Sequence, residues 1–228
     1  MSNFAIFRAA KLKRGSRGAG TFGKALRHLA KHSESCEISR GNMSRFNEFK
    51  SKGSYSDIMA LSKQYEAEHN KYAARAMRKD ASIAVELLFS YSPTKENQSP
   101  EYANKFQKVL IDFCRNELPN LQVVALARHM DEASNHWHII ALPYDKDLCK
   151  YSAKWCLGGP KEMQRLQTRF AEYCKDLGLQ RGISKEITKS KHKTKQEYNR
   201  LQLVEQQKQK ETTIREAMSA LEDIFAER

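Results

Sequence analysis

The chain lacks the features of a membrane-spanning, secreted or disulfide-stabilised protein. It has no apolar run long enough to cross a bilayer, and its first apolar stretch precedes its basic residues, which is the reverse of a secretory signal. Its five cysteines are an odd number without a CxxC pair, which argues against a disulfide framework and a cysteine-type zinc site. We therefore expect a cytoplasmic protein without membrane insertion.

Acidic residues are scarce relative to basic ones. The 228 residues include 40 Lys and Arg but only 27 Asp and Glu, which gives a formal net charge of +13. The excess of basic residues is concentrated in two segments. Residues 11–40 hold eight basic and two acidic side chains, and residues 181–200 hold seven basic and two acidic ones. Two such segments predict a polyanionic partner, with nucleic acid as the natural choice.

The apolar pattern alternates between strand-like and helix-like segments. Strands are predicted at residues 3–10, 82–91, 121–129 and 136–143, with a further one near 148–155. Helices are predicted at residues 23–32 and 56–77, from Pro100 onward, and from Pro160 to Gly178, with Ser56 and Ser99 as N-caps. This order predicts an α+β sandwich with a mostly antiparallel sheet flanked by helices. A Gln-rich segment from about residue 195 predicts a long C-terminal helix.

Three histidines in the segment ALARHMDEASNHWHIIALP, residues 125–143, predict a metal site. Residues two apart on a strand share a face, so His136 and His138 point the same way. If the preceding strand pairs with theirs as a hairpin, His129 lies beside them and completes a three-histidine site with open coordination positions. The loop adds Asp131 and Glu132, each of which could be a fourth ligand, a partner of a ligand or a general base.

The three histidines do not determine which metal ion binds, since three neutral imidazoles suit Zn, Cu or Mn. A closed structural site is the alternative, but it would normally supply a fourth Cys or His ligand, and no Cys lies between Cys114 and Cys149. A divalent cation beside a basic groove can coordinate a phosphate oxygen and stabilise a leaving alkoxide. Phosphodiester cleavage is therefore the preferred reaction class.

Several motifs together resemble one known family. The segment HMDEASNHWH, residues 129–138, is similar to the HxDExxPHxH motif of the Pre/Mob (MobV-type) plasmid-mobilisation relaxases of the HUH endonuclease superfamily. ALRHLAKH at residues 25–32 resembles their N-terminal histidine motif, and MRKDA at 77–81 their central basic motif. GLQRG at 178–182 and KHKTKQEYNR at 191–200 resemble their C-terminal landmarks, so the likeness follows the family's order over most of residues 1–200.

The resemblance implies an HUH-type fold and a specific division of roles. His129, His136 and His138 would hold a divalent metal, most often Mn²⁺, with Mg²⁺ or Zn²⁺ as alternatives, and Glu132 would assist the chemistry. His28 would be the nucleophile that nicks one DNA strand at a plasmid transfer origin and keeps the 5′ end as a phospho-histidine during conjugative mobilisation. Residues 1–200 would form the relaxase catalytic domain of a bacterial protein, and residues 201–228 a helical extension or the start of a coiled coil.

The chain departs from the family pattern at three places. Asn135 stands where the family usually has Pro, which should change loop stiffness more than ligand chemistry. The histidine motif normally continues as HxxR, whereas this chain has Lys31, which keeps the charge but not the planar fork. The family's second motif has its nearest counterpart at Arg45-Phe46. His32 and Tyr55 therefore remain competitors of His28 for the role of nucleophile.

The expected partner is single-stranded or supercoiled origin DNA with an adjacent hairpin. A conjugative coupling protein and a second copy of the chain, bound through the C-terminal helix, are further expected partners. Basic side chains near the matched motifs are predicted to contact DNA: Arg8, Lys13, Arg14, Arg17, Arg27, Lys31, Arg78, Lys79, Lys191 and Lys193.

Two alternatives remain open. One is a related HUH nickase, such as a rolling-circle replication initiator or a single-strand transposase. The presumed nucleophile precedes the metal motif in this chain, as in relaxases, which favours the relaxase. The other alternative is a non-catalytic DNA-binding repressor in which the metal only braces the fold.

Overall fold

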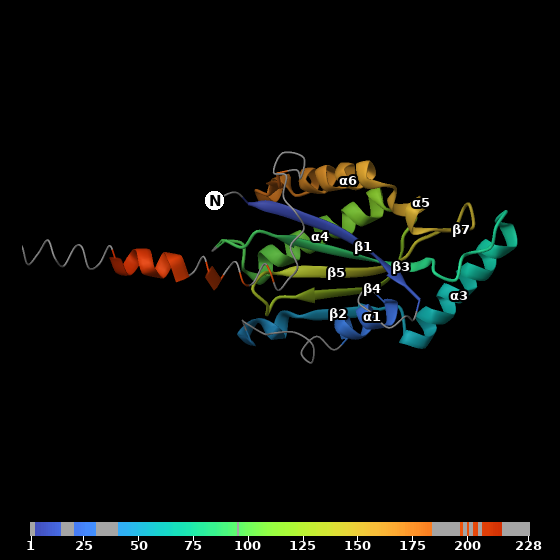
Figure 1. Ribbon diagram of the computed structural model, residues 1–228, viewed down its shortest axis with the longest axis horizontal. Coiled ribbons are helices and arrows are strands. Elements are labelled where there is room, and N and C mark those ends of the chain that lie inside the picture. Colours follow the sequence, from blue (N-terminus) through green and yellow to red (C-terminus); the bar gives the residue numbers. More distant parts are fainter. Residues whose placement is uncertain are drawn as a thin grey trace, which may run out of the picture. The chain divides into compact units, whose positions relative to one another are not determined.

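The computed structural model describes residues 3–14, 21–30, 41–94, 96–183, 197, 200, 203–204 and 207–215. The chain divides into two compact units, Met1–Gly182 and Ile183–Arg228. The first unit holds the sheet and the helices named below (Figure 1). The predicted domain boundary at residue 200 stays a prediction.

Six strands form the central sheet in the spatial order β2-β4-β5-β3-β1-β8. Their bounds are β1 Phe4–Lys13, β2 Glu48–Ser51, β3 Ser82–Tyr91, β4 Gln122–His129, β5 His136–Leu142 and β8 Gln180–Arg181. The pairings in this sheet are antiparallel except the short one between β1 and β8. A separate two-stranded ribbon joins β6, Tyr144–Asp145, to β7, Lys150–Tyr151. The predicted α+β fold with a mostly antiparallel sheet is confirmed.

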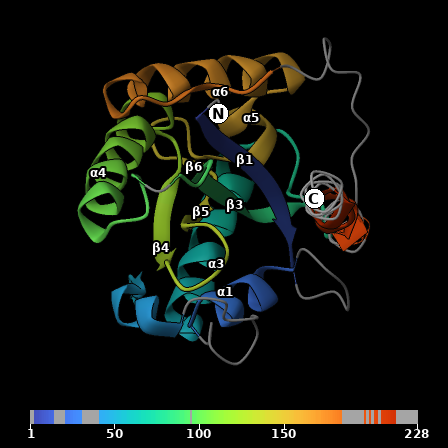
Figure 2. The same ribbon diagram turned by 90° about the vertical axis from the view of Figure 1, so that its left-hand side faces the viewer.

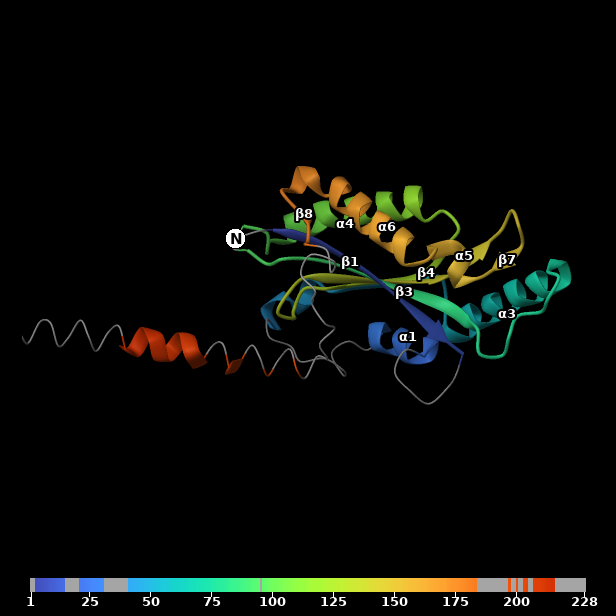
Figure 3. The same ribbon diagram turned by 45° about the horizontal axis from the view of Figure 1, so that its top comes forward.

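Helices cover both faces of the sheet. Their bounds are α1 Phe22–Ala30, α3 Tyr55–Tyr72, α4 Pro100–Glu117, α5 Ala153–Leu157 and α6 Pro160–Tyr173, with short 3₁₀ turns η1 Gly41–Phe46 and η2 Lys175–Leu177. Helices α4 and α6 lie on one face, and α1 and α3 lie on the other (Figures 2 and 3). The sheet therefore separates two hydrophobic cores.

Side-chain alternation along the central strands assigns residues to these cores. Phe89 of β3 and Trp137 of β5 point toward α4 and α6, while Ala127 of β4 and Ile140 of β5 point toward α1 and α3. The α4/α6 side is rich in aromatic rings, and the ring of Phe170 lies 5.0 Å from that of Phe89, centroid to centroid. This layer of packed rings supports the central strands on the sheet face that α4 and α6 cover.

Most predicted elements are confirmed, including the strand at 82–91 and the Ser99 cap of α4. Three predictions were wrong in detail. Helix α6 ends at Tyr173, and the separate turn η2 follows it, so one helix does not extend from Pro160 to Gly178. Helix α3 is capped by Ser54 rather than Ser56, because Ser54 and Asp57 form a reciprocal capping box, and it ends at Tyr72 rather than near residue 77. The expected strand near 148–155 is only the two-residue β7, since Ser152 caps the short helix α5 that follows.

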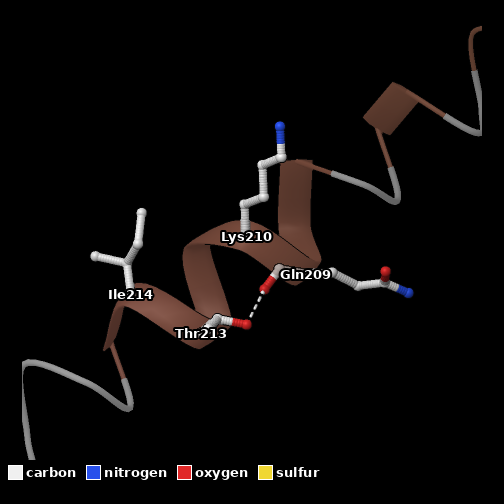
Figure 4. A pocket seen from close by; sticks show the side chains of 4 residues that line it. All are labelled: Gln209, Lys210, Thr213 and Ile214. Carbon is white, nitrogen blue, oxygen red and sulfur yellow. Dashed lines mark hydrogen bonds between the residues drawn. The ribbon is translucent and has the colours of Figure 1, made fainter.

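The second unit contains a described helical segment at residues 207–215, whose side chains are exposed. Within it the Thr213 hydroxyl donates to the Gln209 carbonyl at 3.0 Å, and the surface beside them is a shallow hollow on one helix (Figure 4). None of the described helices combines the length and apolar composition that a membrane span requires.

The aromatic layer makes a prediction about stability. Phe170→Ala leaves a cavity at a fully buried position among four other phenylalanine rings, so we expect the free energy of unfolding to fall by about 3–5 kcal/mol. Urea denaturation checks this value. Tyr72→Ala, at a position 64% exposed, should change stability by less than about 0.5 kcal/mol, and equal effects of the two changes would contradict the assignment.

Candidate metal centre

Antiparallel pairing of β4 with β5 brings the three motif histidines together. The register places His129 opposite His136, and His138 opposite Ala127. All three side chains are on the sheet face that carries α1, where their ring centroids are 5.1 to 5.3 Å apart. The hairpin predicted from the sequence therefore has the register that a three-histidine cluster needs.

Hydrogen bonds engage one ring nitrogen of His138 and one of His136. Nδ1 of His138 lies 2.8 Å from Oε1 of Glu86, and Nδ1 of His136 lies 3.0 Å from the Ser134 carbonyl oxygen. A carboxylate and a carbonyl only accept, so both Nδ1 atoms carry a proton, and in the neutral ring Nε2 is the nitrogen with the lone pair. This is the usual arrangement behind metal-binding histidines.

The donor set fits a divalent cation. Nδ1 of His129 lies 3.2 Å from Nε2 of His136. Metal–nitrogen bonds of about 2.1 Å separate neighbouring ligand atoms by about 3.0 to 3.4 Å, so these two nitrogens already have a ligand-to-ligand spacing. Among the described residues, potential ligand atoms form two overlapping groups in which all members lie within 4.8 Å of one another: His28, His129 and His138, and His129, Glu132 and His136. His129 belongs to both groups, whereas neither group contains both His136 and His138.

The two loop carboxylates have different environments. Asp131 is almost fully buried and accepts hydrogen bonds from the Ser44 hydroxyl at 2.8 Å and the Asn47 amide at 2.7 Å. The side-chain oxygen Oδ1 of Asn47 also accepts from the Met130 backbone N–H at 2.7 Å. Asp131 thus ties the loop to η1, whereas Glu132 approaches His136 with its Oε1 at 3.6 Å from Nε2. Sequence reasoning did not identify Ser44 or Asn47.

Sequence reasoning also missed Glu86. It lies on β3 two residues before Leu88, which pairs with His138. The hydrogen bond from His138 holds the pKa of Glu86 below its ordinary value, although burial acts in the opposite direction, and the nearby charges of His138 and His28 lower it further. The available signal was a single acid inside the apolar strand SIAVELLFSY.

His28 reaches the same cluster from the helix above the sheet. Its ring centroid lies 5.6 Å from that of His138 and 5.9 Å from that of His129, with nearly perpendicular planes. His28 is partly exposed and occupies the last turn of α1. Of its predicted competitors, Tyr55 packs against Gly23 at the start of α1, and His32 lies outside the described residues.

The predicted DNA-contacting residues do not all lie near the cluster. Arg8 is exposed on β1 and pairs with Leu88, which in turn pairs with His138, so Arg8 lies on the same face and in the same row as that histidine. Arg78 pairs with Asp80 at 3.3 Å in the loop before β3, toward the other end of that strand. Four further predicted residues are exposed side chains of the first unit: Lys13, Arg14, Arg27 and Lys79. The other four lie outside the described residues: Arg17, Lys31, Lys191 and Lys193. Arg14 forms an ion pair with Glu66.

Asn135, which departs from the family motif, has a structural role here. It is fully buried, and its side-chain amide donates to the Tyr91 hydroxyl at 2.8 Å, which donates to the Asn97 carbonyl at 3.0 Å. Its own carbonyl accepts from Ser90 at 2.9 Å. Hydrogen bonds to β3 therefore hold the end of the loop immediately before His136.

The fold and this histidine cluster define a domain of the HUH type with a candidate metal site on one face of its sheet. The family model for plasmid recombination enzymes, Mob_Pre, matches residues 1–200, and the chain belongs to this family. The solved MobM relaxase domain (MOBV; Mob_Pre), Mn-bound and in complex with plasmid pMV158 oriT DNA, is 25% identical with a TM-score of 0.65. That match covers 87% of this chain and 98% of the solved one.

Relatives of known sequence are considerably longer. Plasmid recombination enzyme type 1 of Staphylococcus aureus is 33% identical over 136 residues, which are 58% of this chain and 34% of that protein. A 65 kDa protein of Zymomonas mobilis subsp. mobilis is 29% identical over 184 residues, which are 80% of this chain and 30% of that protein. The chain thus spans about a third of the length of these relatives.

Glu86 provides the first test of the cluster. Glu86→Ala removes the acceptor that orients His138, and we expect the affinity for Mn²⁺ to fall by about 10- to 100-fold in calorimetric titration. Glu86→Gln keeps an acceptor oxygen and should lose less. Glu101→Ala changes an exposed glutamate on α4 and serves as the control. Unchanged affinity in Glu86→Ala would show that Glu86 does not support the site.

Asn135 provides a second test. Asn135→Ala deletes a buried hydrogen bond to Tyr91, so we expect the free energy of unfolding to fall by about 1–3 kcal/mol in urea titrations. Tyr91→Phe breaks the same bond from the other side. Because the two residues share one interaction, the double variant should lose less than the sum of the single losses, and strict additivity would contradict the coupling.

Proposed function

We propose that the chain is an origin-specific DNA relaxase that nicks one strand by transesterification. The observation that carries the proposal is the convergence of His28 with His129 and His138, whose potential ligand nitrogens lie within 4.8 Å of one another. A phosphate oxygen held at the cluster would lie beside the His28 ring. The Mn-bound complex of the related MobM domain with oriT DNA supports this assignment.

In this proposal His129, His136 and His138 hold one divalent cation, and the Mn-bound relative favours Mn²⁺. When bound, such a cation offsets charge on the phosphoryl group and stabilises the departing oxygen. Glu86 and Ser134 accept from Nδ1 of His138 and of His136, which leaves Nε2 of each ring for the cation. Asp131 and Asn135 fix the two ends of the loop that separates His129 from His136.

His28 supplies the nucleophile. A neutral ring nitrogen attacks phosphorus, a P–N bond forms, and the bond from phosphorus to the 3′-oxygen breaks. The leaving oxygen takes up a proton from solvent water and becomes a free 3′-hydroxyl, while the imidazole gives up its N–H proton to a carboxylate, for which Glu132 is the proposed acceptor. The 5′ phosphate remains on His28, so the strand can later be rejoined.

His28 could instead be a further metal ligand rather than the nucleophile, because its ring nitrogens group with those of His129 and His138. The two roles differ in what removal of the imidazole does. A ligand contributes to affinity for the cation, whereas a nucleophile contributes to strand cleavage without holding the cation.

His28→Ala separates these roles. Labelled single-stranded DNA tiling the sequence around the gene, incubated with protein and Mn²⁺, should be cut with a covalent adduct that maps to His28. His28→Ala should reduce cleavage by more than about 1,000-fold and leave the Mn²⁺ affinity within about twofold. Lost Mn²⁺ affinity would identify a ligand instead, and an adduct that persists in His28→Ala would identify a different nucleophile.

Tight DNA binding without cleavage, tested with Mn²⁺, Mg²⁺ and Zn²⁺ in turn, would favour a DNA-binding protein over a relaxase. Arg8→Ala is a useful companion variant. It should weaken binding of all strands alike and flatten the salt dependence, because a phosphate contact carries no sequence information.

A further inference from the structure

Two adjoining hollows lie beside the histidine cluster. The first, of about 300 Å³, is lined by His129 and Asp131 together with Ala30 and Phe49. The second, of about 320 Å³, is also lined by Ala30 and Phe49 and extends between α1, β2 and the start of α3. The shared residues make the second hollow a continuation of the candidate metal site.

The second hollow has the chemistry of a site for a flat aromatic ligand. Leu26 and Ile58, both buried, provide an apolar surface. Two rings that line it are unusually open for large apolar groups, since Phe49 is 41% and Tyr55 is 53% exposed. Arg27 adds a cation. Exposed aromatic rings beside a basic side chain are the usual platform for the bases of a single strand.

The sheet register places this platform in line with the cluster. Phe49 pairs with Ala127, Ala127 with His138, His138 with Leu88, and Leu88 with Arg8. Directly opposed residues share a face, so one row across the sheet carries an aromatic ring, a candidate ligand and an arginine. With neighbouring strands about 4.8 Å apart, Phe49 and Arg8 each lie about 10 Å from His138, on opposite sides.

Tyr55 is held in place by its neighbours. Its ring packs on Gly23, where an added Cβ would lie only 3.2 Å from the Tyr55 hydroxyl oxygen, and its centroid is 6.4 Å from that of Phe22. The ring is thus supported on one side by the start of α1 while more than half of it stays exposed. A preformed ring of this kind loses little conformational entropy when a ligand stacks on it.

We infer that the hollow between α1, β2 and α3 takes a nucleobase of the bound single strand, stacked on Phe49 and Tyr55, next to the phosphate held at the histidine cluster. The inference rests on the proposed function, which locates that phosphate. It adds a subsite that recognises the base by its flat face rather than by its edge, so the subsite contributes affinity and position without strong sequence preference.

A comparison of two probes tests the subsite without metal and without cleavage. The probes are a 20-nucleotide thymidine strand and a strand of the same length built from abasic units, which carries the phosphates but no bases. We expect Phe49→Ala to weaken binding of the thymidine strand by about 5- to 100-fold in fluorescence anisotropy and to leave the abasic strand unaffected. Tyr55→Ala should act in the same direction.

Matched variants decide the outcome. Tyr72→Ala removes an exposed ring at the far end of α3 and should bind both strands as the unaltered chain does. Equal weakening of both strands by Phe49→Ala, or no weakening of either, would overturn the subsite. If the subsite is overturned in this way but the unaltered chain still nicks DNA, the proposed relaxase function stands. If Phe49→Ala weakens binding of the thymidine strand alone but the unaltered chain never nicks DNA, the subsite is supported and the relaxase function is contradicted.

A cross-linking experiment needs no variant of the protein. A thymidine strand in which every base is replaced by 5-iodouracil is irradiated with the unaltered chain, and the modified peptides are mapped by mass spectrometry. Cross-links at Phe49 or Tyr55 support the subsite. Cross-links found only at other exposed rings, such as Tyr72 or Trp155, would overturn it.

Discussion

The pairing of β4 with β5 is the constraint on which the candidate site depends. It sets His129 opposite His136 at the end of the hairpin that the loop of residues 130–135 closes, and it places His138 two residues further along the same face. A shift of one residue would turn His136 and His138 toward the aromatic core and bring Trp137 out of it. The buried Trp137, whose ring nitrogen donates to Gln107 at 2.8 Å, therefore helps to hold the histidines in register.

The rest of the first unit orients side chains around that hairpin. Strand β3 supplies Glu86 to the ring of His138 and Ser90 to the loop backbone, while Asp131 joins the other end of the loop to η1. Helix α1 packs across the sheet through its buried Phe22, Leu26 and Leu29, and this packing leaves His28 over the cluster. A rigid aromatic layer on one face thus supports a polar, functional face on the other.

The sequence alone predicted what depends on local pattern and motif. The central strands, the histidine hairpin and the family followed from alternation and from residues 129–138. Contacts between distant segments could not be predicted in this way. In the sequence, Glu86 is a single acid within an apolar strand. Nothing in the sequence links Ser44 and Asn47 to Asp131, which they contact only in the folded chain. The length of α3 was overestimated because the pattern continues past Tyr72, whereas the helix ends there with an extended cap residue, Ala73.

Counting the nitrogens bound to one Mn²⁺ ion tests the central claim most directly. Electron–nuclear double resonance of the chain loaded with one equivalent of Mn²⁺, without DNA, resolves couplings from coordinated imidazoles. The account predicts three inequivalent histidine nitrogens, from His129, His136 and His138. A spectrum of fully hydrated Mn²⁺, or one with a fourth imidazole that disappears in His28→Ala, would contradict it.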